Sequence, residues 1–167
     1  MGKVENIESN SSPNLFNTPL EVGLRGVVIL DQLNEWADLE KIMYLDYLSL
    51  NTKDIGGEES IHAPIPNRGV QVFARKDLLQ KGLVIYLAKE LINVNATDEG
   101  FLYSINNVGK KFLEYFESDY YQLLVSRVKW VVSQFGTKTN SQIREFIKEN
   151  LQEWGGEYLG ADNLGKQ

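Results

Sequence analysis

Residues 74–105, ARKDLLQKGLVIYLAKELINVNATDEGFLYSI, change their hydrophobic period once, and this change decides the expected fold. Leucine recurs at every fourth position in the first part of the stretch, which predicts a helix over residues 74–91. Apolar and polar residues then alternate over residues 92–95 and again over residues 101–105, as they do in strands. Asp98-Glu99-Gly100 between these two runs is a turn signal. The stretch therefore predicts a helix followed directly by a β-hairpin.

A first helix is expected near the start of the chain. It opens at Asn17-Thr18-Pro19, because Asn or Thr can cap a helix and proline suits its first turn. Apolar residues follow at helical spacing and the helix is expected to end near Leu33. Gly23 and Gly26 lower its helix propensity, so we expect another helix to approach it closely at these positions.

A second helix and a long loop are expected between these two regions. Asp38 can cap the helix, whose apolar residues cover more than one side. Glycine and proline interrupt residues 51–72, which predicts a long loop, and such loops are often functional. His62, the single histidine, lies in this loop. It is either a partner contact or a switch, or simply a loop side chain with a local hydrogen bond.

Three further helices are expected after the hairpin. Asn107 can cap the first of them. Ser118 can cap the second, which Gly136 is expected to end. Thr139 or Asn140 can cap the third, which has an apolar stripe at helical spacing.

The order of these elements predicts the fold class. Three helices followed by a hairpin are typical of a winged helix-turn-helix domain, in which the hairpin is the wing. We therefore expect a mainly α (α+β) protein, a winged helix-turn-helix with a two-stranded β-hairpin wing and a C-terminal helical extension. The chain divides into a flexible arm over residues 1–16, a winged-helix domain over 17–106, a C-terminal helical extension over 107–158 and a polar tail over 159–167.

Composition narrows the possible functions. The chain has 167 residues, a net charge of −6, no cysteine and one histidine. The cysteine count excludes disulfides, thiol catalysis and cysteine-ligated metals, and one histidine makes a histidine-based metal site improbable. We predict no catalytic residues, no cofactor and no metal. The sequence has neither a signal-peptide pattern nor a membrane-length apolar run, so we expect no membrane contact and a cytoplasmic protein.

Direct binding of DNA is possible only through a small set of basic residues. The candidates for contacts to the DNA backbone are Arg75, Lys76, Lys81 and Lys89. Asp77 and Glu90 lie among them, and the predicted wing tip carries Asp98-Glu99, which phosphate groups repel. The acidic chain with many aromatic residues in its C-terminal half fits a protein-interaction subunit better. A free-standing winged-helix DNA-binding transcription regulator remains the alternative.

Several segments resemble a known family. They are NTPLEVGLR at residues 17–25, LDYL at 45–48, GGEESIHAPIPNR at 56–68, KGL at 81–83, FLY at 101–103 and WVVSQFG at 130–136. In their order and spacing they resemble the type-two middle component of bacterial ABC-three-component systems, over roughly residues 16–158. One departure is Glu58, where the family tends to have proline after the paired glycines, and it bears on the conformation of the loop.

This resemblance implies a non-enzymatic winged-helix accessory subunit. Such subunits are encoded between an SMC-like ABC ATPase and an effector, often a nuclease, in Lamassu-type anti-phage and anti-plasmid defence. The subunit would sit on the head region of the ATPase and couple it to the effector nuclease, with DNA contacted only indirectly or weakly. The motif positions suggested for partner binding are Glu21, Arg25, His62, Pro64, Pro66 and Arg68. Glu21 and Arg25 are four residues apart, the spacing of a helical ion pair, and they could instead bind the loop.

Overall fold

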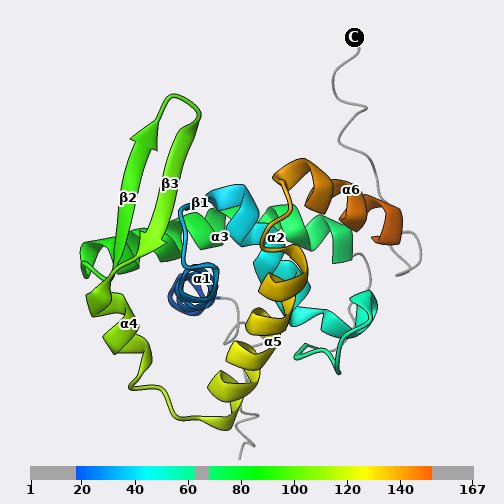
Figure 1. Cartoon of the computed structure of the whole chain (residues 1–167), viewed down its shortest axis with the longest axis horizontal. Helices are drawn as coiled ribbons and strands as arrows, with labels where there is room; N and C mark the ends of the chain where they lie inside the picture. Colours follow the sequence, from blue (N-terminus) through cyan, green and yellow to red (C-terminus); the bar gives the residue numbers. More distant parts are fainter. Residues whose placement is uncertain (1–17, 63–67, 152–167) are drawn as a thin grey trace, which may run out of the picture.

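The computed structural model describes residues 18–62 and 68–151 of the chain. Within these ranges the protein has six α-helices and a three-stranded antiparallel sheet (Figure 1). The predicted arm and polar tail lie outside the described residues, as do Pro64 and Pro66. None of the helices in the described ranges combines the length and the apolar character that crossing a membrane requires.

The first two helices begin where their caps predict. Helix α1 spans Pro19–Leu33, and the Thr18 side chain accepts a hydrogen bond from the Glu21 backbone N–H at 3.3 Å. Helix α2 spans Leu39–Leu50, and Asp38 Oδ1 accepts from the Lys41 backbone N–H at 2.7 Å. Both predicted caps are therefore confirmed, because each satisfies an N–H group that has no partner inside its helix.

The third helix corrects two predicted boundaries. A short 3-10 helix, η1, spans Thr52–Ile55, and α3 spans Arg68–Ala88, so the predicted loop over residues 51–72 is too long. Gly69 does not prevent the helix from starting, because one glycine costs only about 1 kcal/mol and burial of the nearby Val72 offsets it. The helix also ends before Leu91, since Glu90 has a left-handed backbone conformation with φ of 59°.

Helices α1 and α3 cross with their backbones almost touching. A Cβ atom placed on Gly82 would lie 2.3 Å from the Pro19 carbonyl oxygen and 2.6 Å from the Gly23 backbone nitrogen. A Cβ on Gly26 would meet the side chains of Leu79 and Leu83 at 3.1 Å. The close helix approach expected from Gly23 and Gly26 is confirmed, and α3 supplies it.

The sheet contains the predicted hairpin and one strand that was not predicted. Strands β2, Ile92–Thr97, and β3, Gly100–Ile105, form the hairpin. Strand β1, Ala37–Asp38, pairs antiparallel with the other edge of β3, which gives the order β1-β3-β2. Two residues are too few to produce an alternating pattern, so β1 could not be predicted from the sequence. The hairpin projects beyond the helices (Figure 1).

Three helices follow the hairpin. They are α4, Asn107–Leu113, α5, Asp119–Phe135, and α6, Asn140–Leu151. Ser118 caps α5 as predicted, and Thr139 Oγ1 accepts from the Gln142 backbone N–H at 3.2 Å before α6. The predicted cap of α4 is wrong by one residue, because Asn106 accepts from the Gly109 N–H at 2.9 Å and Asn107 is already helical. The fold is thus mainly helical with a small antiparallel sheet, and its winged-helix assignment stays a prediction.

We predict that Gly82→Ala lowers the free energy of unfolding by about 1–3 kcal/mol, because the added methyl group forces the α1 and α3 backbones apart. The gain in helix propensity, about 1 kcal/mol, is too small to compensate. Urea unfolding measures the change, and Val84→Ala, at an exposed position of α3, is the control with an expected change within about 0.5 kcal/mol. A more stable Gly82→Ala variant would contradict the close packing.

Candidate functional site

A buried ion pair lies between α1 and α2. The Arg25 side chain is 0% exposed and that of Asp46 is 3% exposed. Arg25 Nε donates to Asp46 Oδ1 at 2.5 Å, and Nη2 donates to Oδ2 at 3.1 Å. This two-point geometry is the strongest arrangement available to an arginine and a carboxylate. Burial disfavours the charge of Arg25, but the charge and hydrogen bonds of Asp46 outweigh it and raise the arginine pKa.

Two more basic side chains, those of Arg75 and His62, lie near this pair. Arg75 of α3 places Nη1 3.9 Å from Asp46 Oδ2, and burial lowers the pKa of Arg75. His62, in the loop after η1, donates its backbone N–H to the Leu50 carbonyl at 3.4 Å. Burial lowers the pKa of His62, and the charges of Arg25 and Arg75 lower it further against the opposing effect of Asp46. The four residues, here called the charge cluster, thus join three helices to the loop.

The same loop also binds α5, through contacts at its first residues. Thr52 Oγ1 donates to the Glu58 carbonyl at 2.8 Å, and Arg127 Nε donates to the Glu59 carbonyl at 3.1 Å. The guanidinium of Arg127 also forms an ion pair with the Glu58 carboxylate. Gly57 lies against the Trp130 ring, where an added Cβ would be 2.7 Å from the nearest ring carbon. Residues 56–62, here called the held loop, therefore have a defined position on the protein.

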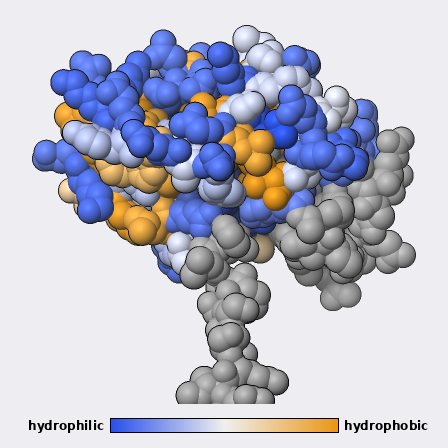
Figure 2. Space-filling model, turned by 90° about the horizontal axis from the view of Figure 1, so that it is seen from below, coloured by the Kyte–Doolittle hydropathy of each residue, from blue (hydrophilic) through white to orange (hydrophobic). Residues whose placement is uncertain are grey.

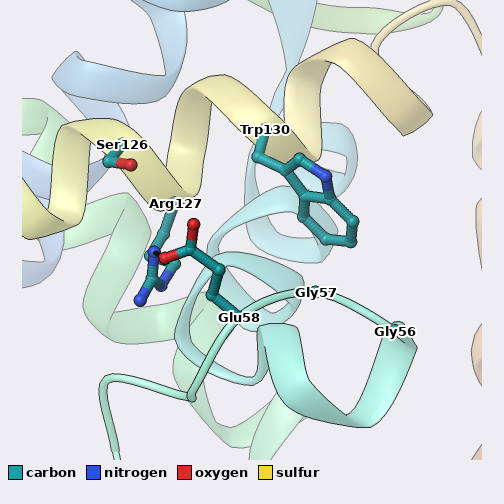
Figure 3. A pocket seen from close by; sticks show the side chains of 6 residues that line it. All are labelled: Gly56, Gly57, Glu58, Ser126, Arg127 and Trp130. Atoms are coloured by element: carbon teal, nitrogen blue, oxygen red, sulfur yellow. Dashed lines mark hydrogen bonds and ion pairs between the residues drawn. The ribbon is translucent and has the colours of Figure 1, made fainter.

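A surface hollow opens where the held loop meets α5. It has a volume of about 470 Å³ and is lined by Gly56, Gly57, Glu58, Ser126, Arg127 and Trp130. Figure 3 shows the Glu58 carboxylate turned toward Arg127, with the Trp130 ring over the paired glycines. The side chains of Glu58 and Glu59 are both 78% exposed. An aromatic ring beside exposed carboxylates and backbone groups is suited to contact with another protein.

The structure brings three of the predicted partner-binding residues together at or beside the charge cluster. Glu21 accepts a hydrogen bond from the Tyr120 hydroxyl at 3.3 Å, and burial raises its pKa against the nearby charge of Arg25. Arg25 is fully buried, so it supports the surface through Asp46 and does not itself reach it. His62 lies in the held loop. Pro64 and Pro66 lie outside the described residues, as does the Arg68 side chain.

Two residues central to the site were missed from the sequence. Asp46 lies within the apolar face of α2, and Arg127 lies among buried residues of α5. A charged residue at an apolar position of a helical pattern was the available signal, because such residues are seldom buried without a partner. Their partners are far away in the sequence, so periodicity does not identify them.

The predicted DNA contacts are not equivalent in the structure. Arg75 points inward to Asp46, and its side chain is 11% exposed. Lys76, Lys81 and Lys89 are exposed, and Lys81 Nζ lies 2.7 Å from Asp77 Oδ2. Contact of the three lysines with phosphate groups stays a prediction.

Four of the six segments that suggested a family meet at this site. The segment at residues 17–25 supplies Arg25, that at 45–48 supplies Asp46 and that at 130–136 supplies Trp130. The described part of the fourth segment, residues 56–62, is the held loop. These segments are far apart along the chain, and a shared structural location explains why they occur together. Seen from below, the surface is mainly hydrophilic with separate hydrophobic patches (Figure 2).

The fold and the site define a mainly helical protein with a projecting hairpin and a surface loop supported by buried charges. A family model for the ABC-three component (ABC-3C) system Middle Component 2 matches residues 15–157, and the chain belongs to this family. The resemblance found in the sequence is thereby confirmed. No curated protein and no solved structure matches the chain. The family match gives no support to the alternative of a free-standing transcription regulator.

We predict that Asp46→Asn lowers the free energy of unfolding by about 3–5 kcal/mol, because it removes the carboxylate that pairs with the buried Arg25 and attracts Arg75. Glu40→Gln is the matched control, since Glu40 pairs with Arg144 in a partly exposed ion pair whose loss costs about 1 kcal/mol or less. Urea unfolding distinguishes the two. Equal losses of stability would show that the buried pair has no special role.

We also predict that His62 makes stability depend on pH. Its folded-state pKa lies below the ordinary value of 6.5, so between these two values the unfolded chain binds the proton more strongly. Its contribution is therefore complete above about pH 6.5 and decreases as the pH falls. Urea unfolding from pH 7.5 to 5 should show a smaller loss of stability in His62→Gln than in the wild type. Parallel curves for the two proteins would contradict this assignment.

Proposed function

We propose that this chain is a non-enzymatic winged-helix accessory subunit that bridges an SMC-like ABC ATPase and an effector nuclease. The complex would act in the cytoplasm in Lamassu-type defence against phages and plasmids. Membership of the Middle Component 2 family supports the accessory role in a multi-component system. The winged-helix assignment is supported by a hairpin that directly follows the third helix and by β1, which completes a small sheet beside it.

The observation that carries the proposal is that the protein binds the held loop at both of its ends. His62 belongs to the charge cluster, and Arg127 binds the opposite part of the loop at Glu58 and Glu59. The two glutamate side chains nevertheless remain 78% exposed. A loop that is already ordered loses little conformational entropy when a partner binds, which favours its use as a contact. We propose that the held loop contacts the ATPase head region or the effector.

Direct DNA binding has a minor place in this proposal. The acidic hairpin tip repels phosphate groups, and Arg75 is engaged with Asp46 inside the protein. Lys76, Lys81 and Lys89 would touch DNA only weakly, or together with the ATPase. The middle component would thus connect its protein partners, while other components of the complex bind the DNA.

Co-expression with the ATPase and effector components of the same system tests the proposal. We expect the tagged wild-type chain to co-purify with both. Gly57→Leu should weaken this association at least tenfold, because a side chain there collides with Trp130 and displaces the loop. Binding titrations with the purified components measure the change.

Val84→Ala is the control for that experiment. Val84 is an exposed residue of α3 and lies outside the held loop. The change should therefore leave the loop in place and the affinity unchanged. Circular dichroism and urea unfolding verify that both variants are folded. If neither component binds the wild type, the bridging role is wrong; if Gly57→Leu binds normally, the held loop is not the contact.

A further inference from the structure

The hairpin exposes an apolar surface at its far end. In the register of β2 and β3, Val94 is opposite Tyr103 and Ala96 is opposite Phe101, so these four side chains share one face. Tyr103 is buried where the hairpin joins the helices. Phe101 is 58% exposed and Val94 is 46% exposed. The apolar face therefore continues from the core to a part of the hairpin that no described element covers.

The outer edge of β3 is only partly paired at the same place. Strand β1 pairs Ala37 with Tyr103 and Asp38 with Leu102, after which the chain enters α2. The Asn106 N–H donates to the Leu91 carbonyl, which fixes the alternation of hydrogen bonds along the hairpin. By this alternation Phe101 directs its backbone N–H and C=O away from β2, toward the outer edge. The last paired residue of β1, Asp38, lies opposite Leu102, one position before Phe101 is reached.

A hollow lies beside this open edge and has an acidic border. Its volume is about 400 Å³, and Asp38, Phe101, Leu102 and the turn at residues 97–100 line it. Thr97 Oγ1 donates to the Gly100 carbonyl at 2.7 Å and accepts from the Glu99 backbone N–H at 3.3 Å. These bonds fix the turn that carries Asp98 and Glu99. Neither carboxylate is in an ion pair with the parts of the chain that the structure describes.

We propose that the outer edge of β3 is a second docking surface, which binds an extended segment of another component of the same system. The segment continues the edge beyond β1 at Phe101, where a carbonyl oxygen of the segment accepts from the Phe101 backbone N–H. An apolar side chain of the segment packs on the Phe101 ring, and a Lys or Arg lies near Asp98 and Glu99. Strand addition gives the affinity, and the charges select the partner.

Charge decides among the possible occupants. The chain has a net charge of −6, so a second copy is a poor electrostatic match for an acidic edge. A nucleic acid backbone is repelled for the same reason. A basic and apolar protein segment satisfies both the carboxylates and the exposed ring. This inference rests on the proposed function, because it takes the partner from the same three-component system.

A charge-reversal experiment tests the docking surface. The double variant Asp98→Lys/Glu99→Lys is co-expressed with the ATPase and effector components and compared with the wild type. We expect at least a tenfold weaker association with one component, and a smaller dependence of the remaining association on salt. Phe101→Ser should weaken association with the same component. Urea unfolding verifies that the variants are as stable as the wild type.

The matched control is Glu145→Lys/Glu149→Lys, which changes the net charge equally at exposed positions of α6 and should leave association unchanged. Hydrogen exchange of the affected component should show a protected Lys- or Arg-containing segment, and Lys/Arg→Glu changes there should restore binding to the reversed hairpin.

Wild-type affinity in the hairpin variants overturns this inference but leaves the bridging role intact. Failure of the wild type to bind either component overturns both, and self-association abolished by the reversal would assign the edge to a second copy.

Discussion

The two-point ion pair between Arg25 and Asp46 is the constraint on which the arrangement of this protein depends. It fixes α1 against α2 in the interior, and Asp46 also attracts Arg75 of α3. A buried ion pair adds little net stability compared with apolar residues of the same volume, but an unpaired buried charge costs several kcal/mol. Alternative packings of the three helices would leave such a charge. We infer that the pair contributes more by disfavouring packings that separate Arg25 from Asp46 than by stabilising the folded state.

The charge cluster also connects the interior to the surface. Its member His62 lies at one end of the held loop, while Arg127 binds the loop to α5 at Glu58 and Glu59. The hairpin is at the other end of the molecule from η1 and this loop (Figure 1). A subunit with two separated contact surfaces can touch two partners at once. The held loop and the outer edge of β3, both proposed as contacts, are the two surfaces on which the proposed bridging role depends.

Much of the fold was predictable because it depends on local interactions. Thr18, Asp38 and Ser118 cap their helices as expected, and the alternation after residue 91 located the hairpin. The errors arose where distant contacts decide. Strand β1 exists only because β3 lies beside it, and α3 begins at Arg68 although Gly69 follows. Of the candidate site, the sequence identified the loop and Arg25, but Asp46 and Arg127 were recognisable only from their partners.

The sequence by itself determined the mainly helical class, the hairpin with its acidic tip, the position of the loop and membership of the family. These properties follow from short-range periodicity, from caps and turns, and from the order of motifs along the chain. Tertiary structure alone decided that Arg25, Asp46, residues 56–62 and Trp130 meet at one place, and that Arg25 is buried there. The physical reason is that the burial of a charge requires a partner in space, and no local pattern of residues shows which partner the packed helices provide.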